Sequence, residues 1–172
     1  IKRNGKVVHY LGMPIQHIND DILKRMGRRT SGAELADKIE LLRSEIPDIC
    51  LRTTLICGFP GETPQAHEEL LEFLNWAEFD RLGAFTYSPE ENTPAASFEG
   101  QLDEETKLTW RDEVMELQQE ISYDRNESMK GRELWAFVEG KVADENAYVA
   151  RTYKDAPGVD GYIFIHTDAE LM

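Results

Sequence analysis

The sequence has little of what cross-links or anchors a chain. Two cysteines in 172 residues cannot form a disulfide framework, and this favours a reducing, cytoplasmic setting. No apolar run approaches the length that spans a membrane, so we expect no membrane partner. Basic residues are also few: 19 lysines and arginines stand against 33 acidic residues, a formal net charge of −14. Such a chain is repelled by phosphate backbones and attracted to basic partners, unless its charge serves only solubility.

The most informative stretch that is present runs from Arg52 to Glu62. An apolar, β-branched run ends there in Gly-Phe-Pro-Gly-Glu, and Thr63-Pro64 follows as the expected start of a helix. Gly58 and Gly61 can adopt backbone angles closed to other residues and let a ligand approach the main chain. Ligands of parallel α/β proteins bind at such strand ends, although a plain tight turn has the same pattern.

Residues 1–102 alternate strand and helix patterns. We expect strands over 7–15, 49–57 and 81–87, with helices at 20–28, 31–46 and 63–78 between them. The alternation predicts right-handed βαβ units and a parallel sheet. Three strands cannot close a barrel. The chain also begins at Ile1 and ends at Met172 in strand-like sequence, so we expect a fragment cut at both ends.

The pattern changes in the last third of the chain. Residues 103–130 predict one long charged helix, and short strands follow over 134–138, 148–152 and 162–166. We therefore expect one unit over 1–128, with the long helix as its link, and a small antiparallel β module over 129–172. Trp135 and Tyr148 are expected in the core of that module, with a docking surface as the alternative.

Several segments together resemble one known family. They are Pro14-Ile15-Gln16-His17, Arg52-Thr53-Thr54 running into Gly58 to Thr63, and Phe85-Thr86-Tyr87-Ser88 with Thr93-Pro94-Ala95. They resemble the methylthiotransferases of the radical S-adenosylmethionine (radical SAM) superfamily, and the β module resembles the start of their TRAM domain. The implied fold class is α/β: the second half of a partial TIM-barrel-like radical SAM domain, followed by a TRAM-like module.

Two further segments resemble the branch that modifies a ribosomal protein (RimO-like) more than the transfer-RNA branch. They are residues 79–91 and Ala150-Arg151-Thr152 with residues 155–161. For an intact enzyme the resemblance implies cleavage of S-adenosylmethionine to a radical, hydrogen abstraction and insertion of a methylthio group. The acceptor in the ribosomal branch is the β-carbon of an aspartate in a small-subunit ribosomal protein.

The resemblance also implies two 4Fe-4S clusters in the intact enzyme, held by cysteines that this chain lacks. Neither the Cys-x-x-x-Cys-x-x-Cys motif nor three further cluster cysteines are present. Cys50 and Cys57 lie on one strand and are expected to be buried core residues, so we expect no metal bound by this chain and no activity from it alone.

The site residues implied by the resemblance lie at strand ends, although none has an assigned catalytic role. The expected cofactor-binding residues are Gln16, His17, Arg52, Gly58, Phe59, Gly61, Glu62 and Tyr87. Some have other interpretations. His17 could be a capping or core histidine, and Glu62 could instead stabilise the first turn of its helix. Arg52 needs either a buried partner, a bound carboxylate or a solvated strand end. Phe85 is expected in the core.

Charge bears on the choice of target. The segment 131–172 has four basic and eight acidic residues, a net charge of −4, which suits a basic ribosomal protein better than transfer RNA. Three functions stay open: the ribosomal-protein enzyme, which we favour; the transfer-RNA adenosine enzyme; and a non-catalytic scaffold that only binds protein.

Overall fold

The computed structural model describes residues 1–171, and its first unit is a parallel sheet of three strands. They are β1 (Tyr10–Gly12), β2 (Cys50–Cys57) and β3 (Arg81–Thr86), in the order β1-β2-β3. β1 is shorter than predicted because Pro14 has no amide hydrogen for the ladder. The chain rejoins the sheet at Gln16, which forms a parallel bridge with Leu55. The expected α/β class is confirmed.

Side-chain caps begin two of the long helices. α2 (Gly32–Glu45) starts with a capping box between Ser31 and Glu34, and α3 (Pro64–Ala77) starts at Thr63, whose hydroxyl accepts from the Ala66 amide. α1 (Asp20–Arg25), the 3-10 helix η1 (Pro94–Ser97) and α4 (Glu104–Glu127) complete the set. No helix formed by residues 1–171 is both long and apolar enough to cross a membrane.

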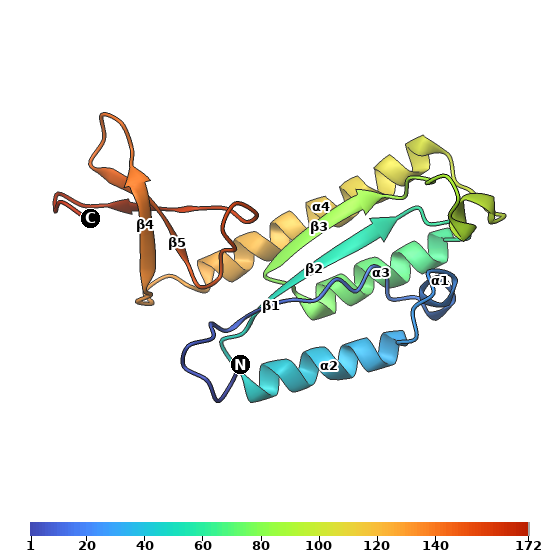
Figure 1. Cartoon of the computed structure of the whole chain (residues 1–172), viewed down its shortest axis with the longest axis horizontal. Coiled ribbons are helices and arrows are strands. Elements are labelled where there is room, and N and C mark those ends of the chain that lie inside the picture. Colours follow the sequence, from blue (N-terminus) through green and yellow to red (C-terminus); the bar gives the residue numbers. More distant parts are fainter. Residues whose placement is uncertain (172) are drawn as a thin grey trace.

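The long helices cover one face of the parallel sheet (Figure 1). Leu51, Leu55 and Cys57 of β2 point into one core with side chains of α2, α3 and α4. Alternate residues of β2 point to the other face and are only partly buried. Phe85 lies on that face and is 60% exposed, so the expectation that it is a core residue is wrong.

The second unit is a three-stranded antiparallel sheet, as predicted. Its strands are β4 (Ala136–Lys141), β5 (Ala147–Thr152) and β6 (Ile163–His166), with a register shift between Val138 and Gly140. Tyr148 is buried, as expected, but Trp135 is 96% exposed just before β4. The prediction of a core tryptophan is therefore wrong.

The antiparallel sheet lies at the end of the parallel sheet where the parallel strands begin (Figure 1). Arg81 donates to Asp155 at 2.6 Å, and the Lys154 ammonium lies 2.8 Å from the Asp80 carboxylate. Asp155 and Lys154 come from the loop between β5 and β6, whereas Asp80 precedes β3 and Arg81 is its first residue. The opposite, C-terminal edge of the parallel sheet faces α1 and the loop after β2.

Candidate functional site

The C-terminal edge of the parallel sheet is built first by Gln16 and His17. Gln16 has a φ of 72°, and its amide donates to the Thr54 carbonyl at 2.9 Å while its carbonyl accepts from Ile56 at 3.0 Å. A left-handed conformation at a residue other than glycine is uncommon and is concentrated at functional sites. These backbone bonds fix where the chain turns away from the sheet and hold His17 at the strand end.

Glu62 organises the loop that follows β2. Its Oε2 accepts from the amides of Gly58 at 2.6 Å and Phe59 at 3.1 Å, and the side chain is fully buried. Because α3 begins at Pro64 with Thr63 as its cap, Glu62 precedes the helix. It therefore holds the amides of its own loop, and the alternative of a first-turn carboxylate is wrong.

His17 joins the end of the first strand to this loop. Its side chain is fully buried, and its Nδ1 accepts from the Asn19 amide at 3.0 Å. The ring proton of the neutral form therefore lies on Nε2, which is 3.2 Å from Glu62 Oε1 but is not aligned for a hydrogen bond. These contacts fit the interpretation of His17 as a buried, capping-type histidine, and its contact to a cofactor stays a prediction.

The two loop glycines make room for side chains of this chain. Gly58 has a φ of 75°, and a Cβ there would lie 2.3 Å from Cγ of Lys107. Gly61 has a φ of 89°, and a Cβ there would lie 2.9 Å from Nε of Arg25. Arg25 donates to the Pro60 carbonyl at 2.9 Å and so clamps the loop from outside. Lys107 and Arg25 fill the space that a Cβ would occupy at these glycines, and the approach of a ligand to the main chain of the loop stays a prediction.

Phe59 and Tyr87 form an aromatic floor beside the loop. Both are buried, and their rings meet edge to face with centroids 5.1 Å apart. The Tyr87 hydroxyl and Gln16 Oε1 are buried and have no hydrogen-bond partner among residues 1–171. Buried polar atoms are normally paired, so these two atoms fit contacts to a bound polar group.

Arg52 is not brought to this edge. It lies near the N-terminal end of β2, where its Nε is 3.4 Å from Asp160 Oδ1 in the loop between β5 and β6. Six residues of extended strand, roughly 20 Å, separate it from Gly58. Of the alternatives for Arg52, the structure shows the buried partner.

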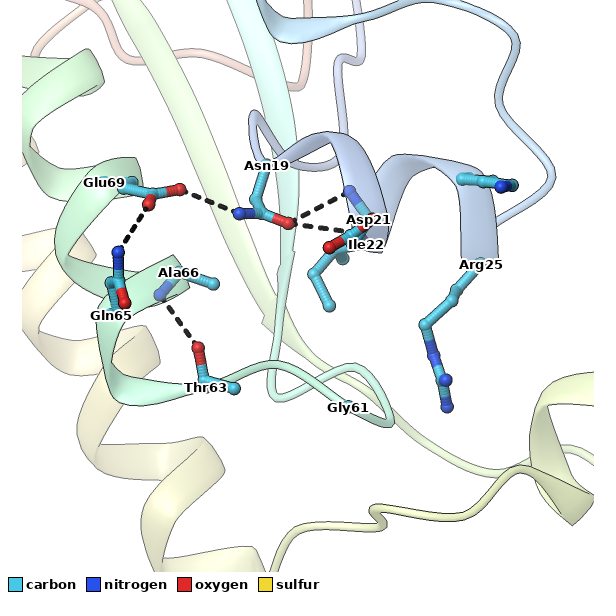
Figure 2. A pocket seen from close by; sticks show the side chains of 10 residues that line it. Asn19, Asp21, Ile22, Arg25, Gly61, Thr63, Gln65, Ala66 and Glu69 are labelled. Carbon is cyan, nitrogen blue, oxygen red and sulfur yellow. Dashed lines mark hydrogen bonds between the residues drawn. The ribbon is translucent and has the colours of Figure 1, made fainter.

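A polar cavity of about 820 Å³ lies between α1 and the start of α3 (Figure 2). Asn19 donates to Glu69 at 2.8 Å across it, and Gln65 donates to the other carboxylate oxygen at 3.3 Å. Among the predicted site residues only Gly61 lines it. Apart from Gly61, the cavity is therefore separate from the strand-end group.

Neither cysteine fits an iron–sulfur cluster. Cys50 and Cys57 are fully buried at opposite ends of β2, as expected for core residues. Burial, together with the charge of Asp80 or Glu62 respectively, raises the pKa of each thiol to about 12. Cluster ligands are thiolates, so these two protonated thiols do not supply them. Among the described residues, no three or more His, Cys, Asp or Glu side chains are arranged so that they could hold a metal ion.

The sequence analysis did not predict three residues of this region: Arg25, His67 and Lys107. Both His67 and Lys107 are nearly fully buried. A signal for each was present, because His67 falls in the stripe of Leu70 and Leu74 on α3, and Lys107 precedes Trp110 and Val114 at helical spacing on α4. A polar residue within an apolar stripe requires a partner. Arg25 had no such signal.

Family models match both units of the chain. Residues 1–74 match the radical SAM superfamily, and residues 131–172 match the TRAM domain. The radical SAM match contains the strand-end group from Gln16 to Glu62. The coproporphyrinogen III oxidase HemN of Escherichia coli, a radical SAM enzyme, superposes with a TM-score of 0.56 over 84% of this chain and 41% of its own, at 15% identity. That likeness concerns the fold alone.

Curated relatives match along the whole chain. The ribosomal protein uS12 methylthiotransferase RimO of Lachnoclostridium phytofermentans is 55% identical over 172 residues, which are 100% of this chain and 39% of the relative. RimO of Carboxydothermus hydrogenoformans is 47% identical over 99% of this chain and 39% of its own length. The chain thus spans about two fifths of the length of these relatives.

Proposed function

Since this chain belongs to the radical SAM methylthiotransferase family, we propose that it is the segment of a uS12-modifying enzyme that forms one wall of the cofactor site and carries the target-binding module. The complete enzyme, in this proposal, methylthiolates the β-carbon of an aspartate in the small-subunit ribosomal protein. It works in the cytoplasm, where ribosomes are available. In this proposal the two units divide near residue 128, just after the last residue of α4, Glu127.

One observation carries this proposal: identity of 55% to a uS12 methylthiotransferase extends over all 172 residues, through both units. A shared radical SAM fold alone would support many reactions, because fold does not determine function. Here the similarity also includes the module expected to contact the target, so it supports the substrate class as well as the chemistry.

The strand-end group fits S-adenosylmethionine. Gln16 Oε1 and the Tyr87 hydroxyl are buried polar atoms free to bond its polar groups, and Phe59 offers an apolar ring beside them. Glu62 and His17 position the loop, and Gly58 and Gly61 allow its turn. The cofactor supplies the radical chemistry, while these residues bind it, orient it and exclude water. Arg52 has no place in this group.

The radical SAM family implies iron–sulfur chemistry, yet this chain shows no cluster cysteines. In our proposal both 4Fe-4S clusters of the complete enzyme are held by cysteines outside this segment. Cys50 and Cys57 contribute to the core only.

The antiparallel sheet is the proposed docking surface for uS12. Trp135 is 96% exposed and Phe137 is 68% exposed, and acidic side chains outnumber basic ones two to one in residues 131–172. Exposed aromatic rings within an acidic surface suit lysine and arginine side chains, through cation–π contacts and complementary charge.

One observation favours transfer RNA as a second candidate target. The Arg151 guanidinium, which is partly exposed and pairs with Glu139, lies 5.0 Å from the centroid of the Phe137 ring, and arginine and aromatic groups can stack on bases. The net charge of −4 opposes it, because binding of a phosphate backbone requires basic residues.

The experiment is deletion of the complete gene, followed by mass spectrometry of both uS12 and total transfer RNA. We expect loss of one methylthio group from uS12 and an unchanged transfer RNA. Loss from a transfer-RNA adenosine instead would overturn the proposed target. No change in either molecule would support the protein-binding scaffold. Re-expression of the intact gene should restore the methylthio group and so controls for secondary effects of the deletion. Re-expression of a variant that lacks the TRAM-like module tests whether that module is needed.

A further inference from the structure

A second histidine, His67 on α3, lies between two carboxylates. Its Nε2 is 2.7 Å from Glu113 Oε2 on α4, and its Nδ1 is 3.8 Å from Glu62 Oε1. The ring also stacks on Trp110 of α4, with centroids 4.8 Å apart and planes 8° from parallel. Two contacts from one helix therefore fix the ring, and its remaining nitrogen faces the carboxylate that shapes the loop.

Glu62 gathers two imidazole rings at one oxygen. Oε2 is committed to the loop amides, and Oε1 faces both His17 Nε2, at 3.2 Å, and His67 Nδ1, at 3.8 Å. All three groups are buried. Neither ring is hydrogen-bonded to Oε1, and in neutral His67 the ring proton lies on Nε2, toward Glu113. The two buried rings therefore constrain the Glu62 carboxylate by packing around Oε1, which keeps it in the position where Oε2 holds the amides.

His67 is also the connection from this buried group to the surface. Glu113 is half exposed, whereas the Glu62 and His17 side chains are fully buried. The chain of contacts Glu113–His67–Glu62 thus links α4 to the loop after β2, and α4 itself continues to the antiparallel sheet.

We propose that His67 is a positioning residue: held by Glu113 and Trp110, it fixes the Glu62 carboxylate and through it the Gly58–Phe59 amides of the cofactor loop. The importance of this loop for the cofactor rests on the function proposed above. The fixing of the loop by His67 does not.

The test measures backbone amide exchange in the complete protein, with no S-adenosylmethionine added. His67→Gln should speed exchange of the Gly58 and Phe59 amides roughly tenfold, because the carboxylate that accepts from them is no longer held. Glu62→Gln should do the same. The double variant should exchange no faster than Glu62→Gln alone, since His67 acts only through Glu62.

His9 provides a matched control. It also pairs with a carboxylate at 2.7 Å, that of Asp48, at the opposite end of the sheet. His9→Gln should leave exchange of the Gly58 and Phe59 amides unchanged. Exchange in His67→Gln equal to that of the unaltered protein would overturn the proposal, and so would additive effects in the double variant.

A second measurement separates this inference from the proposed function. The dissociation constant for S-adenosylmethionine should rise about tenfold in His67→Gln, with a smaller change in kcat. Faster loop exchange with an unchanged dissociation constant would support the positioning role of His67 and would count against the placement of the cofactor at this loop.

Discussion

At the scale of single residues, the loop glycines separate backbone strain from packing. Gly27, Gly58 and Gly61 all have positive φ, but only at Gly27 is the space around an added methyl group open. Gly27→Ala should lower the free energy of unfolding by about 1 kcal/mol through backbone strain alone. Gly58→Ala should cost roughly 2–4 kcal/mol, because its methyl group would also displace Lys107.

Thermal or denaturant unfolding of the complete protein checks the glycine prediction. Gly140 is the control, since it has neither positive φ nor a neighbour within 4 Å of an added Cβ. Equal decreases in the free energy of unfolding for Gly27→Ala and Gly58→Ala would show that the clash with Lys107 does not destabilise the protein.

Asp80 is the second residue whose replacement should be severe. Its buried carboxylate accepts from the Leu51 amide at 3.0 Å and lies 3.0 Å from Arg125 and 2.8 Å from Lys154. Burial alone would raise the pKa of Asp80, but the Lys154 and Leu51 hydrogen bonds and the charge of Arg125 outweigh it and lower that pKa. Asp80→Asn should cost about 3 kcal/mol near neutral pH, because it removes the charge that pairs with the partly buried Lys154 and Arg125.

The pH dependence of this effect has a definite sign. A carboxyl whose pKa is lower in the folded state stabilises it fully above its ordinary pKa of 3.8 and loses that contribution as pH falls through the lowered value. The difference in unfolding free energy between Asp80→Asn and the unaltered protein should therefore shrink in acid. Asp48→Asn, at an exposed carboxylate, should stay within about 0.5 kcal/mol throughout.

At the scale of elements, the antiparallel sheet exposes rings that its own stability does not require. Trp135 is 96% exposed, so Trp135→Ala should change the unfolding free energy by less than about 0.5 kcal/mol. It should nevertheless weaken binding of uS12 several-fold, measured by calorimetry with the complete enzyme. Trp76→Ala on α3 is the control, and equal affinity in the two variants would contradict docking at Trp135.

The elements also show where sequence reasoning succeeds. The caps at Ser31 and Thr63 are local devices, readable from three or four consecutive residues, and the structure has both. Arg52 shows where sequence reasoning fails. Its partner Asp160 lies 108 residues away in the other unit, and no local sequence pattern predicts this contact. Trp135 and Phe85 failed for a related reason: a strand pattern gives two faces but not which face is covered.

The candidate site divides in the same way. Strand–glycine–helix order predicted that Gln16, the loop and Tyr87 meet at one edge, and they do. The packing behind that edge was not predictable, because Arg25 and Lys107 reach the loop from other helices and depend on how these helices pack.

At the scale of the whole molecule, charged pairs hold the two sheets together. The Arg81–Asp155 contact at 2.6 Å is partly buried, and hydrogen bonds from Arg81 and Thr152 lower the pKa of Asp155 against the opposing effect of burial. Asp155→Asn should loosen the antiparallel sheet without unfolding the parallel one. Limited proteolysis should then cut near residues 128–135 faster, while Asp168→Asn, at an exposed carboxylate, should not change the rate.

The two buried thiols have a consequence for experiments on the complete enzyme. With pKa values of about 12 and no exposed sulfur, Cys50 and Cys57 should resist alkylation by iodoacetamide at pH 8 while the protein is folded. Any cysteine that reacts in the native protein must then lie elsewhere in the polypeptide. This segment should therefore contribute no labelled thiols, and the number of labelled thiols in the complete enzyme can report the removal and reconstitution of iron.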